Sequence, residues 1–263
     1  MTLSLFETQR AMRQRREAAL RRGVVAVLDI GSSKVACLIL QIAADPAAPD
    51  HNYYFDGVTY HLYYNPREMF DIVTGVRAGL DSFGLEDKQV WVNETNAPPT
   101  DDPLEPPPDE PQFAVSSAEQ AAFVIQAFAL LVAGGADRIA LYKFRNDPDA
   151  AGVIEPFGLL RADNSRRPAF DAFKVVTTYF SGYTNYSWVH QGNFYIVTLD
   201  RGEQTTTVLW NTSSEDRPFA INAIAPQAML VDPTGAVRPI TAAGGVYTIV
   251  LPGATCPGEA CVI

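Results

Sequence analysis

The chain has 263 residues, of which 47% are hydrophobic, and its formal net charge is −10. This length is enough for one large domain or two ordinary ones, and no apolar run reaches the roughly 18–20 residues of a membrane span. Residues 1–45 hold seven basic and four acidic side chains, whereas residues 46–263 hold 13 basic and 26 acidic ones. An acidic body repels phosphates, so the composition argues against a nucleic-acid partner and suggests that two unlike pieces join near residue 45.

The first 45 residues predict a basic helix followed by a hairpin. TQRAMRQRREAALRRG has the composition of a helix and ends at Gly23. VVAVLDI predicts a buried strand, GSSK a tight turn and VACLILQI a second strand. No cleavage site follows the apolar stretch, so we expect no signal peptide and, for the chain as it stands, a cytoplasmic location.

The stretch QRAMRQRREAALRRGVVAVLDIGSSKVACLIL resembles the N-terminus of the actin-like cell-division ATPase FtsA, in its alphaproteobacterial form. The resemblance covers residues 1–43 and implies phosphate contacts from Gly31, Ser32, Ser33 and Lys34. That family also needs a second glycine-rich loop downstream, and the only candidate is LDRGEQTTT. This candidate lacks the necessary glycines and favours a β-hairpin around its Gly. Despite this missing loop, the resemblance of residues 1–43 keeps an ATP-binding cell-division protein as one alternative for the function.

The segment from 50 to 182 predicts three strand–helix units in a row. Strands are expected at 55–64, 88–94 and 137–144, and helices at 66–84, 116–135 and 169–182. The second helix opens with two overlapping capping boxes, Ser116 with Glu119 and Ser117 with Gln120. Repeated strand–helix units indicate parallel strands, as in a doubly wound sheet or a (β/α)8 barrel. In both folds ligand chemistry gathers at the carboxyl ends of the strands.

Residues 183–263 predict an antiparallel β-sandwich. Its seven short strands are YSWVHQ, NFYIVTL, TTTVLWN, FAINAIA, AMLVDP, VRPITA and VYTIVLPG, separated by Gly, Asn and Pro turns. Trp188 and Trp210 are either carbohydrate contacts or core residues. Cys256 and Cys261, in CPGEAC, either form a short disulfide loop or stay free.

Residues 50–263 resemble the C-terminal part of a clan A glycoside hydrolase. The resemblance is carried by FDGVTYHLYYNP, VWVNETNAPP, SSAEQAAF and GLLRADNSRRPAFDAFK, followed by the β-rich segment. It implies an α/β plus all-β fold: the last three units of an incomplete (β/α)8 barrel, then an antiparallel β-sandwich. With the N-terminal helix and hairpin, the expected domains are 1–45, 50–182 and 183–263, joined as an apparent chimera within 43–52.

The resemblance also implies a function, the retaining hydrolysis of an O-glycosyl bond with Glu94 as the nucleophile. Tyr or Asn donors near such a carboxylate lower its pKa and aim it. The expected carbohydrate-binding residues are His61, Tyr63, Asn93, Asn96, Tyr142 and Lys143, and no metal or cofactor is expected. The sugar and the linkage stay open.

The pattern departs from that family at one essential point. A retaining glycosidase needs a second carboxylic acid about 5–5.5 Å from the nucleophile. The family holds it in an Asn-Glu-Pro setting on the fourth strand, but the only Asn-Glu pair here is Asn93–Glu94. Glu155 is the nearest spare carboxylate, and we do not expect it to act as the acid/base. The sequence therefore predicts a truncated glycosidase with weak or no activity.

A non-catalytic scaffold or carbohydrate-binding fragment is a further alternative. In that interpretation Glu94 is a solvated loop residue, His61 is bonded to backbone and the tyrosines pack in the barrel. Three barrel strands leave open sheet edges, from which self-association is possible. A glycosidase part derived from an exported protein would change the expected location. A gene fusion, an assembly error and a designed sequence all remain open.

Overall fold

The structure is a computed structural model that describes residues 24–30, 35–41, 53, 55–107 and 115–255. It divides into two compact units, Met1–Asp56 and Gly57–Ile263. The predicted basic helix, the phosphate-contacting turn at 31–34 and the cysteines of CPGEAC lie outside the described residues.

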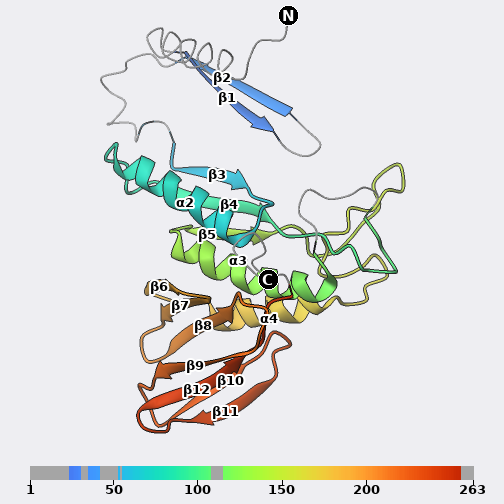
Figure 1. Cartoon of the computed structure of the whole chain (residues 1–263). Coiled ribbons are helices and arrows are strands. Elements are labelled where there is room, and N and C mark those ends of the chain that lie inside the picture. Colours follow the sequence, from blue (N-terminus) through green and yellow to red (C-terminus); the bar gives the residue numbers. More distant parts are fainter. Residues whose placement is uncertain (1–23, 31–34, 42–52, 54, 108–114, 256–263) are drawn as a thin grey trace, which may run out of the picture. The chain divides into compact units, whose positions relative to one another are not determined.

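The first unit contains a two-stranded antiparallel ribbon (Figure 1). Strand β1 (Val24–Ile30) pairs with β2 (Val35–Gln41), with Val24 opposite Gln41 and Ile30 opposite Val35. This pairing confirms the two predicted strands, whose β-branched and aliphatic residues favour extended backbone.

The second unit begins with a three-stranded parallel sheet in the order β3-β4-β5 (Figure 1). The strands are β3 (Gly57–His61), β4 (Gln89–Thr95) and β5 (Arg138–Leu141), and the helices are α2 (Pro66–Asp81), α3 (Ser117–Ala133) and α4 (Pro168–Tyr179). The predicted order of strands and helices is confirmed. Among the described strands, β3 and β5 each pair only with β4, so self-association through these edges stays a prediction.

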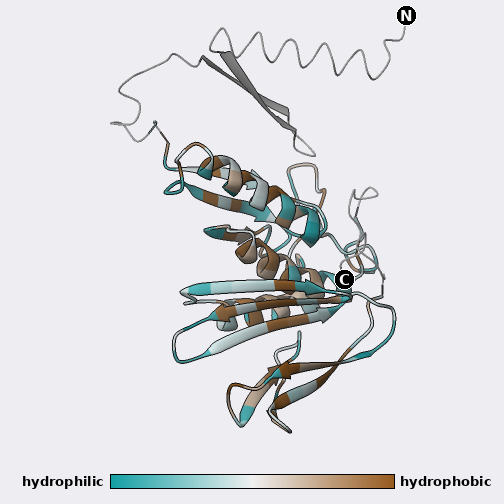
Figure 2. Cartoon of the chain, turned by 60° about the vertical axis from the view of Figure 1, so that its left-hand side comes forward, coloured by the Kyte–Doolittle hydropathy of each residue, from teal (hydrophilic) through white to brown (hydrophobic). Residues whose placement is uncertain are grey.

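Local signals set the helix starts. The Asn65 side chain accepts a hydrogen bond from the Glu68 amide, and Pro66 occupies the first turn of α2. At α3 the first capping box forms, with reciprocal bonds between Ser116 and Glu119, while Ser117 binds Asp101 instead. Helix α3 is buried over most of its length because it packs against both α2 and α4, and Figure 2 shows its apolar colouring. None of the helices in the described ranges combines the length and apolar character that crossing a membrane requires.

The C-terminal segment forms all seven predicted strands. They are β6 (Asn185–Gln191), β7 (Phe194–Asp200), β8 (Thr205–Asn211), β9 (Arg217–Asn222), β10 (Gln227–Val231), β11 (Val237–Thr241) and β12 (Val246–Leu251). Every pairing is antiparallel, but the strands form three small sheets, β6-β7-β8, β9-β12 and β10-β11, instead of the two sheets of a simple sandwich. The LDRGEQTTT stretch is the β7–β8 hairpin, with Gly202 at φ 78°.

Buried residues from both sides of the expected boundary between barrel and sandwich, at 182 and 183, form one hydrophobic core. The ring of Trp188 on β6 packs edge-on against Phe70 of α2, with centroids 4.5 Å apart. Trp210 is buried and stacks on Tyr195. Both tryptophans therefore pack against neighbouring aromatic rings, and the division into domains 50–182 and 183–263 stays a prediction.

Candidate active site at the carboxyl end of the parallel sheet

The candidate site is built where β3, β4 and β5 end. A β-bulge shifts the register between β3 and β4, so that Tyr60 lies opposite Val92 while His61 lies opposite Glu94. Such bulges commonly re-aim side chains beside active sites. The bulge brings the polar ends of two neighbouring strands together.

Glu94 is the centre of this group. The Tyr63 hydroxyl donates to Glu94 Oε2 across 2.8 Å, and His61 Nδ1 lies 3.0 Å from the same oxygen. The Glu94 side chain is 31% exposed, so it is held by neighbours yet open to solvent. No described side chain engages Oε1, which leaves that oxygen available to a ligand.

The side chain of Asn93 contacts the second ring nitrogen of His61 and so bears on its tautomer. Its Nδ2 lies 3.2 Å from His61 Nε2. With this amide nitrogen donating, the neutral imidazole carries its hydrogen on Nδ1 and donates it to Glu94. Asn93, His61 and Glu94 thus form a short hydrogen-bonded chain along the edge of the sheet.

Three aromatic rings cluster around the Tyr63 side chain. Tyr63 lies edge-on to Tyr142, with centroids 6.2 Å apart, and Phe157 contacts both rings at 5.3 and 5.8 Å. Burial, the hydrogen bond to Glu94 and the charge of that carboxylate all raise the pKa of Tyr63 far above its ordinary value. The Tyr63 hydroxyl therefore stays protonated, and stays a donor, at neutral pH.

Strand β5 ends earlier than the sequence predicts, so Tyr142 and Lys143 lie just beyond it. The Tyr142 hydroxyl donates to Glu155 Oε2 across 2.5 Å, and Lys143 Nζ lies 3.7 Å from the same oxygen. Burial and the hydrogen bond to Glu155 raise the pKa of Tyr142 to about 12, with a smaller contribution from Glu94. A second carboxylate therefore stands beside the aromatic rings that contact the first.

Asn96 takes a different position from the other predicted site residues. It is 1% exposed, and its Nδ2 donates to the carbonyl of Phe157 across 2.6 Å. Gln120 of α3 reaches the same carbonyl from 3.4 Å. The structure places Asn96 beneath the site, where it supports the backbone that carries Phe157.

A buried ionic network holds the same loop. Arg167, with 0% side-chain exposure, donates to the carbonyls of Pro156 and Gly158 and pairs with Asp102 and Glu105. The carbonyls on both sides of Phe157 are thereby bound by one guanidinium. The position of this loop is therefore determined by charges that come from the proline-rich stretch after Glu94.

Further bonds complete this network. Arg161 donates to Asp102 across 2.8 Å, Asn146 Nδ2 donates to Glu105 across 2.5 Å, and the Gly158 amide donates to Asn146 Oδ1 across 2.6 Å. Burial opposes ionisation of Asp102, but the hydrogen bonds from Arg167 and Arg161 outweigh it and hold the pKa of Asp102 below its ordinary value. Buried charges paired in this way are costly to separate.

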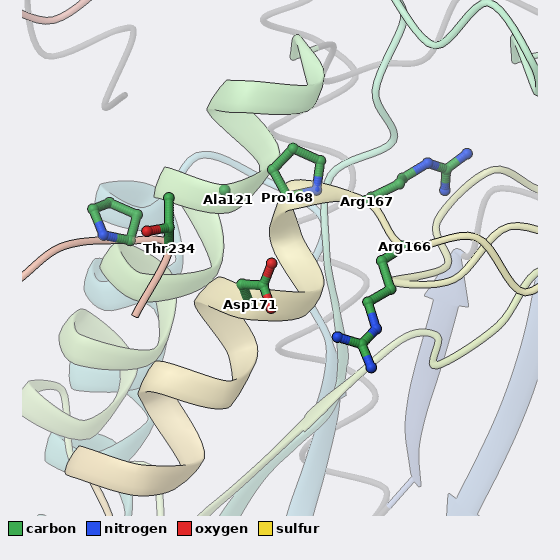
Figure 3. Close-up of a pocket in the computed structure, with 7 residues that line it drawn as sticks. Ala121, Arg166, Arg167, Pro168, Asp171 and Thr234 are labelled. Carbon is green, nitrogen blue, oxygen red and sulfur yellow. The ribbon is translucent and has the colours of Figure 1, made fainter. Parts of the chain in front are cut away.

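A separate hollow lies at the start of α4 (Figure 3). Its lining includes Ala121, Arg166, Asp171 and Thr234, and none of the residues around Glu94 lines it. Figure 3 shows Arg166 and Arg167 pointing to different sides. Because none of the Glu94 group lines this hollow, we place the candidate chemistry at the strand ends, where Glu94 has two side-chain partners.

Phe157 and the ionic network are not part of the site that the sequence predicts, and Glu155 is there only a spare carboxylate. The motif IEPFG holds Glu155 and Phe157, but nothing in its local pattern indicates that they contact strand ends. The charged residues of the network lie in loops that are far apart in the sequence, such as Asp102 and Arg167. Only the fold brings these residues together.

No protein-family model matches the chain, and no curated protein does. Solved structures do match. The chain shares its fold with glycoside hydrolases. One is a family 39 glycoside hydrolase from the gut symbiont Bacteroides cellulosilyticus WH2, with TM-score 0.59, 21% identity, and coverage of 79% of this chain and 45% of the other. Another is a family 30 endoxylanase from Clostridium papyrosolvens C71, with TM-score 0.51, 13% identity, and coverage of 80% and 49%.

The chain spans just under half the length of these two solved structures. At such identities the likeness establishes the fold, a mixed α/β arrangement consistent with part of a barrel and a β domain, and the reaction must be argued from the site. None of the comparisons supports the resemblance of residues 1–43 to FtsA.

Proposed function

We propose that this chain is a glycoside hydrolase-like protein in which Glu94 is the nucleophile of a retaining reaction on an O-glycosyl bond. The observation that carries the proposal is that Glu94 Oε2 has two donors, Tyr63 and His61, at the end of the central parallel strand. A nucleophilic carboxylate has to be held still, and these donors hold it while leaving Oε1 free. The fold shared with glycoside hydrolases supports the same reaction class.

The reaction proceeds in two displacements. In the first, Oε1 of Glu94 attacks the anomeric carbon, and the bond to the leaving oxygen breaks with its electron pair on that oxygen. In the second, water attacks the anomeric carbon, gives its proton to a solvent water molecule, and displaces Glu94 as a carboxylate. Since none of the described residues matches the acid/base of the family's fourth strand, we propose weak or no turnover of substrates whose leaving oxygen needs a proton.

Trapping the glycosyl-enzyme tests the nucleophile without that acid. The chain is incubated with 2,4-dinitrophenyl 2-deoxy-2-fluoro-β-glycosides of xylose, glucose and galactose, whose leaving group departs as a stable anion. Intact mass followed by peptide mapping is expected to find one sugar on Glu94. Glu94→Gln should abolish the adduct, while Glu203→Gln, on the β7–β8 turn, should keep it. Labelling elsewhere, or equal labelling of Glu94→Gln, would refute the role of Glu94.

The carbohydrate-binding alternative predicts a different result. A non-catalytic carbohydrate-binding fragment would bind sugars reversibly and form no adduct. Nucleotide binding is not proposed, because the only candidate for its second phosphate loop is the turn of the β7–β8 hairpin.

A further inference from the structure

Glu155 and Glu94 are linked through a pair of tyrosines. Tyr63 donates to Glu94 and Tyr142 donates to Glu155, and the two rings meet edge to face. Each carboxylate also raises the pKa of the other's tyrosine, besides the larger effects of burial and of the direct hydrogen bond. The two carboxylates therefore belong to one site, although they come from different strand ends.

The position of Glu155 is well determined. Pro156, Phe157 and Gly158 follow it directly, and the carbonyls of all three accept hydrogen bonds from buried side chains. A Cβ on Gly158 would lie 2.4 Å from the Leu160 carbonyl, so the backbone there is closely packed. The Glu155 side chain itself is 54% exposed, and it projects from this rigid segment with its carboxylate accessible.

The charges of this site favour an uncharged ligand. Glu94 and Glu155 supply two carboxylates, and Lys143, the nearby cation, already lies 3.7 Å from Glu155. Arg145 is paired with Asp147 across 2.5 Å and also donates to Asn164, which leaves it engaged elsewhere. An anionic sugar would meet excess negative charge, whereas a hydroxyl group can donate to a carboxylate and accept from an ammonium group.

We propose that Glu155 and Lys143 form a hydroxyl-binding subsite for a neutral sugar beside Glu94. Glu155 accepts a hydrogen bond from one hydroxyl of the sugar, and Lys143 donates to the same or a neighbouring one. Glu155 is thus a specificity-determining residue and not the missing proton donor, because its existing contacts with Tyr142 and Lys143 are those of a hydrogen-bond acceptor. The inference rests on the proposed function, since it concerns the sugar that Glu94 attacks.

The test measures how fast the fluoro-sugars label Glu94 in the wild type, Glu155→Gln and Asp147→Asn. Asp147 is an exposed acid in the same loop, so its variant controls for the loss of one charge. Glu155→Gln is expected to slow labelling about tenfold or more, the effect of one charge-assisted hydrogen bond, while Asp147→Asn stays within about twofold. On the monodeoxy sugar that lacks the contacted hydroxyl, the wild type and Glu155→Gln should react at equal rates.

Two results would overturn this role. The first is equal labelling of Glu155→Gln and Asp147→Asn with every sugar. The second is a decrease in the labelling rate of Glu155→Gln that becomes larger when a phenyl leaving group replaces dinitrophenyl. Such a result would identify Glu155 as a proton donor. Faster labelling by a glucuronide than by the glucoside would overturn the preference for neutral sugars.

Failure of the proposed function would be seen separately, as no adduct in the wild type. Saturation-transfer NMR with xylose, glucose and glucuronate then decides the subsite. Binding of a neutral sugar that is lost in Glu155→Gln and kept in Asp147→Asn supports it. Absence of binding, or binding unchanged by Glu155→Gln, overturns it.

Discussion

The guanidinium of Arg167 donates to the carboxylate of Asp102 across 2.7 Å, and neither side chain is exposed. Replacing Arg167 by Met would leave Asp102 and Glu105 buried without their principal partner. Breaking a buried ion pair from one side costs about 3–5 kcal/mol, so we expect Arg167→Met to lose that much free energy of unfolding in urea.

The matched control is Arg145→Met. Its partner Asp147 lies 2.5 Å away, but the two side chains are 43% and 61% exposed. An exposed pair contributes about 0–1 kcal/mol, because water and salt screen it. Similar losses in the two variants would contradict the stabilising role of the buried network.

Acid should weaken the same network. The pKa of Asp102 is lowered from its ordinary 3.8 in the folded chain, because hydrogen bonds from Arg167 and Arg161 outweigh its burial. A lowered folded-state pKa gives stability that is present above the unfolded value and is lost as the pH falls through the folded one. Urea titrations from neutral pH to about pH 3 should therefore show a shallower decline in Asp102→Asn than in the wild type.

The start of α3 distinguishes two serines that the sequence presents as equivalent. Ser116 caps the helix by accepting from the Glu119 amide, whereas the hydroxyl of Ser117 donates to the exposed Asp101. Ser116→Ala should cost about 1 kcal/mol of unfolding free energy, and Ser117→Ala less than half of that. Equal losses would contradict the assignment of Ser116 as the cap of this helix.

Two glycines should respond to alanine with opposite signs. At Gly158 a new Cβ would lie 2.4–2.6 Å from atoms of Leu160 and Asn146, so the Phe157 loop must shift and the chain should lose about 1–3 kcal/mol. At Gly75, inside α2, nothing lies within 4 Å of the added Cβ, and Gly75→Ala should gain about 0.5–1 kcal/mol. Thermal and urea unfolding measure both changes.

The hydroxyl of Tyr63 should affect the chemistry more than the fold. Tyr63→Phe removes a donor to Glu94, and we expect labelling of Glu94 by the fluoro-sugars to slow about tenfold. Tyr64→Phe is the control, because Tyr64 is exposed and makes no bond to Glu94. The measurement is the ratio of the two labelling rates. A ratio near one would show that the Tyr63 hydroxyl does not assist Glu94.

Most elements of the fold could be predicted from the sequence, because their signals are local. The strands around Val90 and Val92 and the helix that begins after Ser116 lie within a few residues of their expected bounds. The family resemblance implies that His61, Tyr63 and Glu94 act together, and this agrees with the parallel strands, whose carboxyl ends lie at one edge of the sheet.

The position of the second carboxylate, Glu155, could not be predicted from local signals. Glu155 lies in a long loop with little regular structure, and its position depends on bonds that Arg167 makes with acids about sixty residues earlier in the chain. The same holds for Asn96: the family resemblance implies a ligand contact, whereas in the structure its side chain donates to the Phe157 carbonyl. Long-range charge pairing leaves no periodicity that a single sequence can reveal.

The contact between Trp188 and Phe70 has a practical consequence for anyone who divides this chain. Because the Trp188 ring packs against Phe70 in the same core, calorimetry of residues 57–263 should give a single melting transition. A gene cut between codons 182 and 183 would yield two halves that each expose an aromatic surface. Mixed in solution, the two halves should bind each other through these surfaces, as the parts of a split reporter do.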